Sequence, residues 1–360
     1  MERVYLRPTA FVDSPVGLDE AARRLAGGLI WFSAVEVIRR SGASVARELV
    51  SVAAIKARLP ELGEAASTVW RRLTAPRPAL TMGSRTIPLD QPQVMGIVNV
   101  TPDSFSDAGQ HAEASAAIEA GHAMAAAGAA IVDVGGESTR PGAEPVPIAE
   151  ELRRVLPVVR ALAELGVTVS IDTRKAAVAE AAFGAGAHLV NDVSAMTYDD
   201  RMAEVLAASR APIVLMHHQG DPQTMQDDPR YADVMAEVFH WLEERIAAAV
   251  AAGIARDRMI VDPGIGFGKT VAHNLALLNG LALFHGLGCP IVLGASRKRM
   301  IGALANEAPA NQRLAGSIAL AVKAAEQGAQ IIRVHDVPET VQALKVWRGL
   351  RDQALTPRLA

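Results

Sequence analysis

The 360-residue sequence predicts a (β/α)8 TIM barrel preceded by a small N-terminal module. Eight apolar runs each end in a polar cluster, and Ala-, Leu- and Glu-rich stretches of helical period separate most of them. Strands that alternate with helices imply a parallel sheet, and buried parallel strands are unbroken apolar runs. Residues 93–351 supply the roughly 250 residues that such a barrel needs. Its chemistry is expected on the loops that follow the strands.

The runs and their polar clusters follow one another along the chain as GIVNVTPDSFSD, VDVGGESTRPG, VSIDTRK, LVNDVS, VLMHHQGDP, IVDPGIGFGK, IVLGASRK and IIRVHD. Helical stretches lie between them at 112–127, 148–165 and 231–252. Polar residues crowded at the ends of many strands indicate one site built from all of them.

Composition narrows the class of protein. Half of the residues are hydrophobic and the formal net charge is −3, which argues against disorder, a nucleic-acid surface or an acidic partner. Cys289 is the single cysteine, so no disulfide forms within the chain and a reducing compartment fits best. No apolar stretch reaches the roughly 18 residues of a membrane span. The first residues lack the apolar core of a signal peptide, so we expect a cytoplasmic protein without a membrane partner.

Residues 1–76 are predicted to form a separate α/β or mainly helical module, and residues 77–360 the barrel. Segments 4–12 and 30–38 have strand character. A helix is indicated by apolar residues at helical spacing, namely Val45, Leu49, Val52, Ile55 and Leu59, and a second helix is expected from Pro60 to about Leu73. The module is expected to serve packing or oligomer contact and to be dispensable for chemistry. Residues 81–89 could form a hairpin that closes the barrel floor.

The glycine-rich segment Gly264-Ile265-Gly266-Phe267-Gly268-Lys269-Thr270 resembles a phosphate-binding loop at first sight. A P-loop requires a glycine five positions before Gly268, where the chain has Pro263. The glycines also alternate as G-x-G-x-G, which does not fit a dinucleotide fingerprint. A nucleotide site is therefore not expected here.

Two adjacent histidines, His217 and His218, lie near Asp221 and could be metal ligands. Neighbouring side chains of a strand point to opposite faces, so both cannot easily reach one ion. Structural histidines are the favoured interpretation.

Asp133 lies inside an apolar strand, between Val132 and Val134. It is either catalytic or an acceptor for loop amides around Gly135 and Gly136. We favour the second role.

Asp172, Asn191 and Asp262 are stronger candidates, because each ends a different predicted strand. Such groups are costly to bury without partners, and a ligand that offers donors would satisfy them. A planar heterocycle with a guanidine-like edge does so, since a carboxylate accepts two parallel N–H bonds.

Positive charge is predicted at the same mouth of the barrel. Lys298 and Arg333 end the last two strands, His335 follows, and Arg140 comes from the second loop. Together they suit a ligand that also carries phosphate.

The ordered segments NVTPDSF, GGESTRPG, IDT, NDV, DPGIGFGK, SRK and RVHD resemble dihydropteroate synthase, from about residue 81 to the end. The resemblance implies a transferase of folate biosynthesis. It joins 6-hydroxymethyl-7,8-dihydropterin diphosphate to 4-aminobenzoate, giving 7,8-dihydropteroate and diphosphate, and it is a sulfonamide target. A homodimer is also implied.

The resemblance assigns residues to both substrates. The pterin diphosphate falls on Asp172, Asn191, Asp262, Lys298, Arg333, His335 and Thr139, and 4-aminobenzoate on Thr139, Arg140, Pro141, Phe267 and Ser296. Asn99 matches the family's Mg²⁺ ligand, and Asp103 lies on the first loop. Asp103, Lys298, Arg333 and His335 are the implied catalytic residues. Because an arylamine is already nucleophilic at pH 7, positioning and charge stabilisation should suffice.

Two rival functions remain open. A barrel that passes a methyl group from a reduced folate to a corrinoid would share the pterin pocket, but it has no use for the diphosphate and aminobenzoate segments. A non-catalytic pterin-binding paralogue would have degenerate motifs, whereas these are intact. The first loop, Ser106-Asp107-Ala108-Gly109, and the Ser194-Ala195-Met196 segment depart from the family pattern beside the motifs. Altered loop mobility is expected there sooner than altered chemistry.

Overall fold

The computed structural model describes residues 3–42, 44–83, 85–100, 107–138, 144–220 and 224–356, and it confirms the barrel. Its parallel strands are β7 (Gln93–Asn99), β8 (Ile131–Gly135), β9 (Val169–Asp172), β10 (Leu189–Asp192), β11 (Ile213–Met216), β12 (Met259–Asp262), β13 (Val292–Leu293) and β14 (Ile331–Val334). They pair in the order β12-β11-β10-β9-β8-β7-β14-β13. A bridge between Val261 and Ile291 joins the two ends of this order and closes the barrel.

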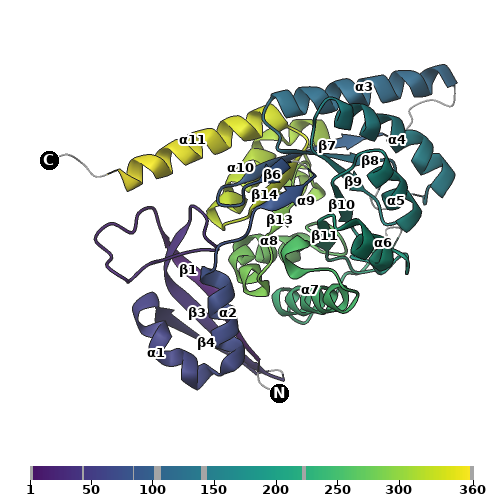
Figure 1. The fold of residues 1–360 in the computed structure, drawn as a ribbon. Coiled ribbons are helices and arrows are strands. Elements are labelled where there is room, and N and C mark those ends of the chain that lie inside the picture. Colours follow the sequence, from purple (N-terminus) through teal and green to yellow (C-terminus); the bar gives the residue numbers. More distant parts are fainter. Residues whose placement is uncertain are drawn as a thin grey trace.

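Helices surround the strands (Figure 1). They are α3 (Asp107–Ala126), α4 (Ile148–Glu164), α5 (Ala176–Gly184), α6 (Met202–Ser209), α7 (Val234–Ala251), α8 (Val271–Asn279), α9 (Arg299–Leu304), α10 (Leu314–Glu326) and α11 (Val337–Leu355). Short 3₁₀ helices η1 (Arg256–Arg258), η2 (Leu281–Leu287) and η3 (Ala310–Gln312) supplement them. Within the described ranges, no helix has the length and apolar character that a membrane crossing requires.

A hairpin closes the barrel floor, as expected from the sequence. It consists of β5 (Leu80–Met82) and β6 (Arg85–Ile87), paired antiparallel. Its apolar side chains form one cluster with inward residues from the strands, namely Met95, Ile131, Leu189, Val214, Ile260, Val292 and Ile331. Fully burying a side chain of this size contributes about 1.5–3 kcal/mol, so the plug stabilises the closed end. The polar strand ends are thereby left to the opposite mouth.

The N-terminal module is an antiparallel sheet covered by two helices. Its strands are β1 (Arg3–Val12), β2 (Arg23–Arg24), β3 (Trp31–Ser41) and β4 (Ser44–Ser51), and its helices are α1 (Val52–Leu62) and α2 (Glu64–Thr74). The long strand β3 pairs with β1 on one side and with β2 and β4 on the other. The two strands expected from the sequence are therefore present.

The expected start of the first helix at Val45 is wrong, because residues Ser44–Ser51 pair with β3 as a strand. Val45 and Leu49 are four residues apart, and this spacing is a multiple of the strand period of two as well as one helical turn. The expected helix start at Pro60 is also wrong. Pro60 lies inside α1. The helix ends before Gly63, whose φ of 89° favours glycine.

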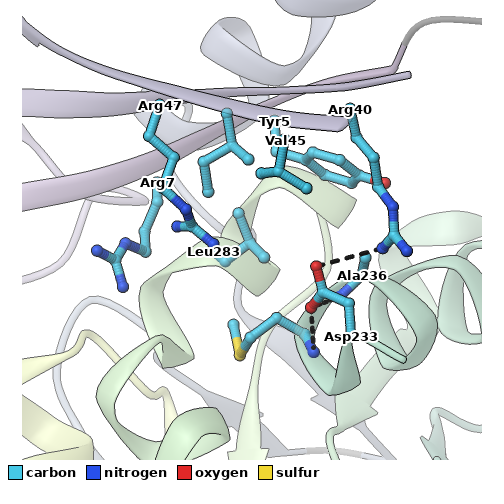
Figure 2. A pocket seen from close by; sticks show the side chains of 10 residues that line it. Tyr5, Arg7, Arg40, Val45, Arg47, Asp233, Ala236 and Leu283 are labelled. Carbon is cyan, nitrogen blue, oxygen red and sulfur yellow. Dashed lines mark hydrogen bonds and ion pairs between the residues drawn. The ribbon is translucent and has the colours of Figure 1, made fainter. Parts of the chain in front are cut away.

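The module packs against the barrel beside α7 and η2. Arg40 of β3 forms an ion pair with Asp233 at 3.2 Å, and Figure 2 shows its side chain reaching across to the start of α7. Tyr5 bonds through its hydroxyl to His240 of α7. Buried Phe32 of the module and Phe284 of η2 belong to one core cluster. The module therefore packs against the barrel, whereas its role and its dispensability for chemistry stay predictions.

Candidate active site

Three buried polar side chains lie at the carboxyl ends of β9, β10 and β12. Asp172 ends β9 and pairs in register with Asn191 of β10, while Asp262 ends β12. Each is less than a tenth exposed. Burial raises the pKa of Asp172 to about 7 and also raises the pKa of Asp262. These strand ends therefore line a polar site at the mouth of the barrel, as the sequence predicts.

Arg333 of β14 bonds to carboxylates on β8 and β9. Its Nε donates to Oδ2 of Asp133 and its Nη2 to Oδ2 of Asp172, each over 2.6 Å. Burial works against the charge of this guanidinium, but the two carboxylates outweigh it and raise the pKa of Arg333. The charge is thus fixed at the centre of the barrel mouth.

Asp133 does not accept from loop amides, so the favoured interpretation of this residue is wrong. It is fully buried, and Oδ2 accepts from Arg333 and, over 2.9 Å, from Nδ2 of Asn191. Its side chain points into the closed barrel, where the other strands supply better partners than its own loop. Asp133 therefore orients two of the predicted pterin residues.

Asp262 at the end of β12 and Lys298 just before α9 also belong to this mouth of the barrel. Oδ1 of Asp262 accepts from the amide of Gly264 over 2.7 Å. Lys298 is the residue before α9 and lies beyond the end of β13, which stops at Leu293. Its Nζ lies 4.0 Å from the centroid of the Phe267 ring. Burial lowers the pKa of Lys298 to about 8, although Asp262 opposes this shift.

Ser296 and His335 contact each other directly. The hydroxyl of Ser296 lies 3.1 Å from Nδ1 of His335 and accepts from its backbone N–H over 3.2 Å. The sequence places Ser296 with the arylamine and His335 with the diphosphate. The contact brings these two predicted regions together.

Other predicted residues fall on the first two loops. Asp103, Thr139, Arg140 and Pro141 lie outside the described residues, so their roles stay predictions. Asn99 is described: it ends β7 and is exposed at the carboxyl end of the strand.

A buried ion-pair network at the base of the second loop was not predicted. Nζ of Lys175 contacts the carboxylates of Glu137 and Glu151 and donates to the carbonyl of Val146 over 2.7 Å. Glu137 also accepts from the amide of Val146 over 3.0 Å. The network thus links the two sides of the segment that carries Thr139–Pro141. The Glu of GGES and the Lys of IDTRK were visible in sequence, but their pairing depends on adjacent strands.

Asp221 lies outside the described residues. The structural role expected for both histidines agrees with the contacts of His217. His217 is buried, and its Nδ1 lies 2.8 Å from Nζ of Lys269. Burial, with Lys269 adding to the effect, lowers the pKa of His217 to about 2, so the ring is neutral. Nδ1 of His218 lies 3.2 Å from the carbonyl oxygen of Gly220. Across the described part of the chain, no group of three His, Cys, Asp or Glu side chains could hold a metal ion.

A magnesium ion at this mouth is compatible with the side chains present. Mg²⁺ usually keeps several waters and binds through one or two protein oxygens together with substrate phosphates. The exposed amide oxygen of Asn99 suits such a shared ion, and no acidic cage is needed.

A barrel whose mouth combines buried carboxylates, an amide and a fixed guanidinium defines a pterin-binding enzyme class. The sequence pattern of the family described as pterin binding enzyme matches residues 95–335, and the chain belongs to this family.

The similar proteins within the family are dihydropteroate synthases. The enzyme of Escherichia coli K12 is 50% identical over 262 residues, covering 72% of this chain and 92% of the relative. A Yersinia pestis dihydropteroate synthase with a sulfonamide drug has 49% identity and a TM-score of 0.72, covering 76% of this chain and 99% of its own. The Xanthomonas albilineans enzyme with 4-aminobenzoic acid has 48% identity and a TM-score of 0.72, covering 78% and 100%.

Proposed function

We propose that this chain forms 7,8-dihydropteroate by joining 6-hydroxymethyl-7,8-dihydropterin diphosphate to 4-aminobenzoate, with release of diphosphate. The observation that carries this proposal is the ring of Asp172, Asn191, Asp262 and Arg333 at one barrel mouth. The names of the similar enzymes state the same activity.

The pterin is proposed to lie among these four side chains. Asp262 accepts from its guanidine-like edge, because a carboxylate suits two parallel N–H donors. Asp172 and Asn191 bind the remaining polar edge, and Arg333 lies over the ring system. Lys298 donates from the other side. Arg333 is already held by Asp133 and Asp172, so little ordering is needed when the ligand arrives.

The arylamine is proposed to bind between Phe267 and Ser296, with Thr139, Arg140 and Pro141 completing the site. The Phe267 ring offers an apolar wall, and Ser296 is held by His335. An arylamine is largely neutral at pH 7 and attacks the pterin methylene carbon without a strong base. The protein then acts mainly by positioning, which is worth several kcal/mol when the reacting atoms are aligned.

Diphosphate leaves as its C–O bond to the methylene carbon breaks, the arylamine nitrogen forms the new C–N bond, and the proton that this nitrogen loses passes to solvent. The charge that develops on the departing diphosphate requires stabilisation. Arg333 and His335 are proposed to anchor the diphosphate. Asp103, on the first loop, is proposed as a further catalytic residue. Asn99 would hold Mg²⁺. When bound, that ion neutralises charge on the departing phosphate oxygens.

A homodimer and a cytoplasmic location also belong to the proposal. The homodimer follows from the resemblance to the family, and the cytoplasmic location from the sequence pattern, with the buried thiol of Cys289 suiting a reducing compartment. Analytical ultracentrifugation at several concentrations tests the dimer, which a constant monomer mass would contradict.

The reaction itself is tested by incubating the enzyme with the dihydropterin diphosphate, 4-aminobenzoate and Mg²⁺. Equal release of dihydropteroate and diphosphate is expected. Pterin binding without product would instead favour a non-catalytic paralogue. Methyl transfer from a reduced folate to a corrinoid would favour the other rival.

A further inference from the structure

The segment between β12 and α8 carries Phe267, and its backbone is held by a buried lysine. Nζ of Lys269 donates to the carbonyls of Gly264 and Phe267, each over 2.9 Å. The side chain is only 3% exposed. One ammonium group therefore joins two carbonyls of the turn that places the Phe267 ring.

Side chains from the segment before α7 hold two further carbonyls of this turn. The hydroxyl of Tyr231 donates to the carbonyl of Gly268 over 2.9 Å, and Nε2 of Gln226 donates to that of Gly266. The turn is thus held by side chains that have no place in the proposed pterin site. Its conformation does not depend on ligand contacts alone.

The backbone conformation of the turn also demands glycine. Gly264 and Gly268 have φ values of 68° and 63°, in the left-handed region. A Cβ on Gly264 would lie 1.8 Å from the carbonyl oxygen of His217, and one on Gly268 would lie 2.4 Å from that of Gln219. The turn is therefore pressed against the end of β11, where Lys269 also reaches His217.

Because these contacts hold the turn, the Phe267 ring has a defined position beside Lys298. Nζ of Lys298 lies 4.0 Å from the Phe267 ring centroid, and its stem passes 3.2 Å from where a Cβ on Gly266 would lie. The backbone of Lys298 is held separately from the turn, because its N–H donates to the carbonyl of Ala295 and its carbonyl accepts from the N–H of Ile301. Movement of the turn would therefore displace the Phe267 ring first, whereas the backbone of Lys298 stays in place.

We propose that Tyr231 and Lys269 are positioning residues for the arylamine, acting through the backbone that carries Phe267. The inference rests on the proposed function, because it assigns the Phe267 wall to 4-aminobenzoate. Neither side chain needs to touch a substrate. Their effect should fall on arylamine binding, since Asp172, Asn191 and Arg333 are held by other contacts.

Tyr231→Phe is the main test, with Tyr198→Phe as the matched control. The first variant removes a single hydroxyl that bonds to Gly268, whereas Tyr198 is half exposed and stacks on Arg174 instead. A net hydrogen bond is worth about 0.5–1.5 kcal/mol, which corresponds to roughly 2- to 12-fold. We therefore expect the KM for 4-aminobenzoate to rise by about that factor, with kcat and the calorimetric Kd for the pterin unchanged. The control should match wild type.

Lys269→Met removes both carbonyl contacts and should raise the same KM more than Tyr231→Phe does. If this variant fails to fold, the Tyr231→Phe result still decides. An unchanged KM in Tyr231→Phe, or an equal loss of pterin and arylamine binding, would overturn the inference. Absence of turnover in wild type and in the Tyr198→Phe control would contradict the proposed function instead, so the two failures are distinguishable.

Discussion

Arg333 donates from Nε to Oδ2 of Asp133 over 2.6 Å, across the intervening strand β7. Asp133 is fully buried, whereas the Arg333 side chain is 20% exposed at the barrel mouth. The carboxylate therefore acts as a buried support for a guanidinium that faces the site. Buried pairs of this kind are costly to break, because one charge is then left without its partner.

Asp133→Asn should weaken this support. The variant keeps the size of the side chain but loses the charge that faces Arg333. We expect the free energy of unfolding to fall by about 1–3 kcal/mol, and kcat/KM for the pterin diphosphate to fall with it. Chemical denaturation and steady-state kinetics provide the measurements. Asp352→Asn, at a half-exposed ion pair, is the control, and equal behaviour of the two variants would contradict the role of Asp133.

The affinity for pterin should fall both when the pH is lowered and when it is raised. The pKa of Asp172 is raised by burial to about 7, so the carboxylate gains a proton as pH falls through that value. The pKa of Lys298 is lowered by burial to about 8, so its charge is lost as pH rises through that value. Affinity for a pterin without phosphates should therefore be greatest between about pH 7 and 8. Calorimetry across this range measures it.

Lys298→Arg provides the control for the alkaline side, because arginine keeps its charge well above pH 8. Its pterin affinity should no longer fall as pH rises. A fall that persists in this variant would assign the alkaline change to another group.

Asn99→Ala should separate phosphate chemistry from ring binding. The amide lies at the end of β7, whereas the bonds that fix Arg333 come from Asp133 and Asp172. Loss of turnover and of its dependence on added Mg²⁺ is expected, while affinity for a pterin lacking phosphates is retained. If that affinity drops to the same extent, the substitution has damaged the fold and Asn99 has no separate role.

Sulfonamides should inhibit in competition with 4-aminobenzoate. They share the length, aromatic ring and para-amine of that substrate, and rejecting a close mimic requires an element that clashes with it. The described turn around Phe267 consists of the glycine-rich segment Gly264–Gly268, which offers only the Phe267 and Ile265 side chains. Inhibition should therefore weaken as 4-aminobenzoate is raised, with slow use of the drug as an alternative amine. Inhibition that is absent, or insensitive to 4-aminobenzoate, would place the arylamine elsewhere.

The barrel could be predicted from sequence because its signals are local. Each strand is an apolar run, and each ends in a polar cluster such as Ile171-Asp172 or Val261-Asp262. Those ends must meet once the strands close in parallel. The gathering of these polar side chains at one mouth was therefore predictable together with the fold, even though their partners were not.

The errors arise where a local pattern fits two structures or where the partner is remote. The four-residue spacing of Val45 and Leu49 fits a strand as well as a helix, and only pairing with β3 decides. Asp133 and Arg333 are 200 residues apart, so their contact depends on closure of the whole barrel. Bracing of the Phe267 turn by Tyr231 likewise has no sequence signature.

The pterin affinity of wild type and of Asp262→Asn tests the proposed site most directly. Asp262 ends β12, and the variant removes a charged acceptor while keeping the size of the side chain. Calorimetry with a pterin lacking phosphates should show a loss of about 1.5–3 kcal/mol, the usual scale for a charged hydrogen bond. Unchanged affinity in a correctly folded Asp262→Asn variant would contradict a pterin site at these strand ends.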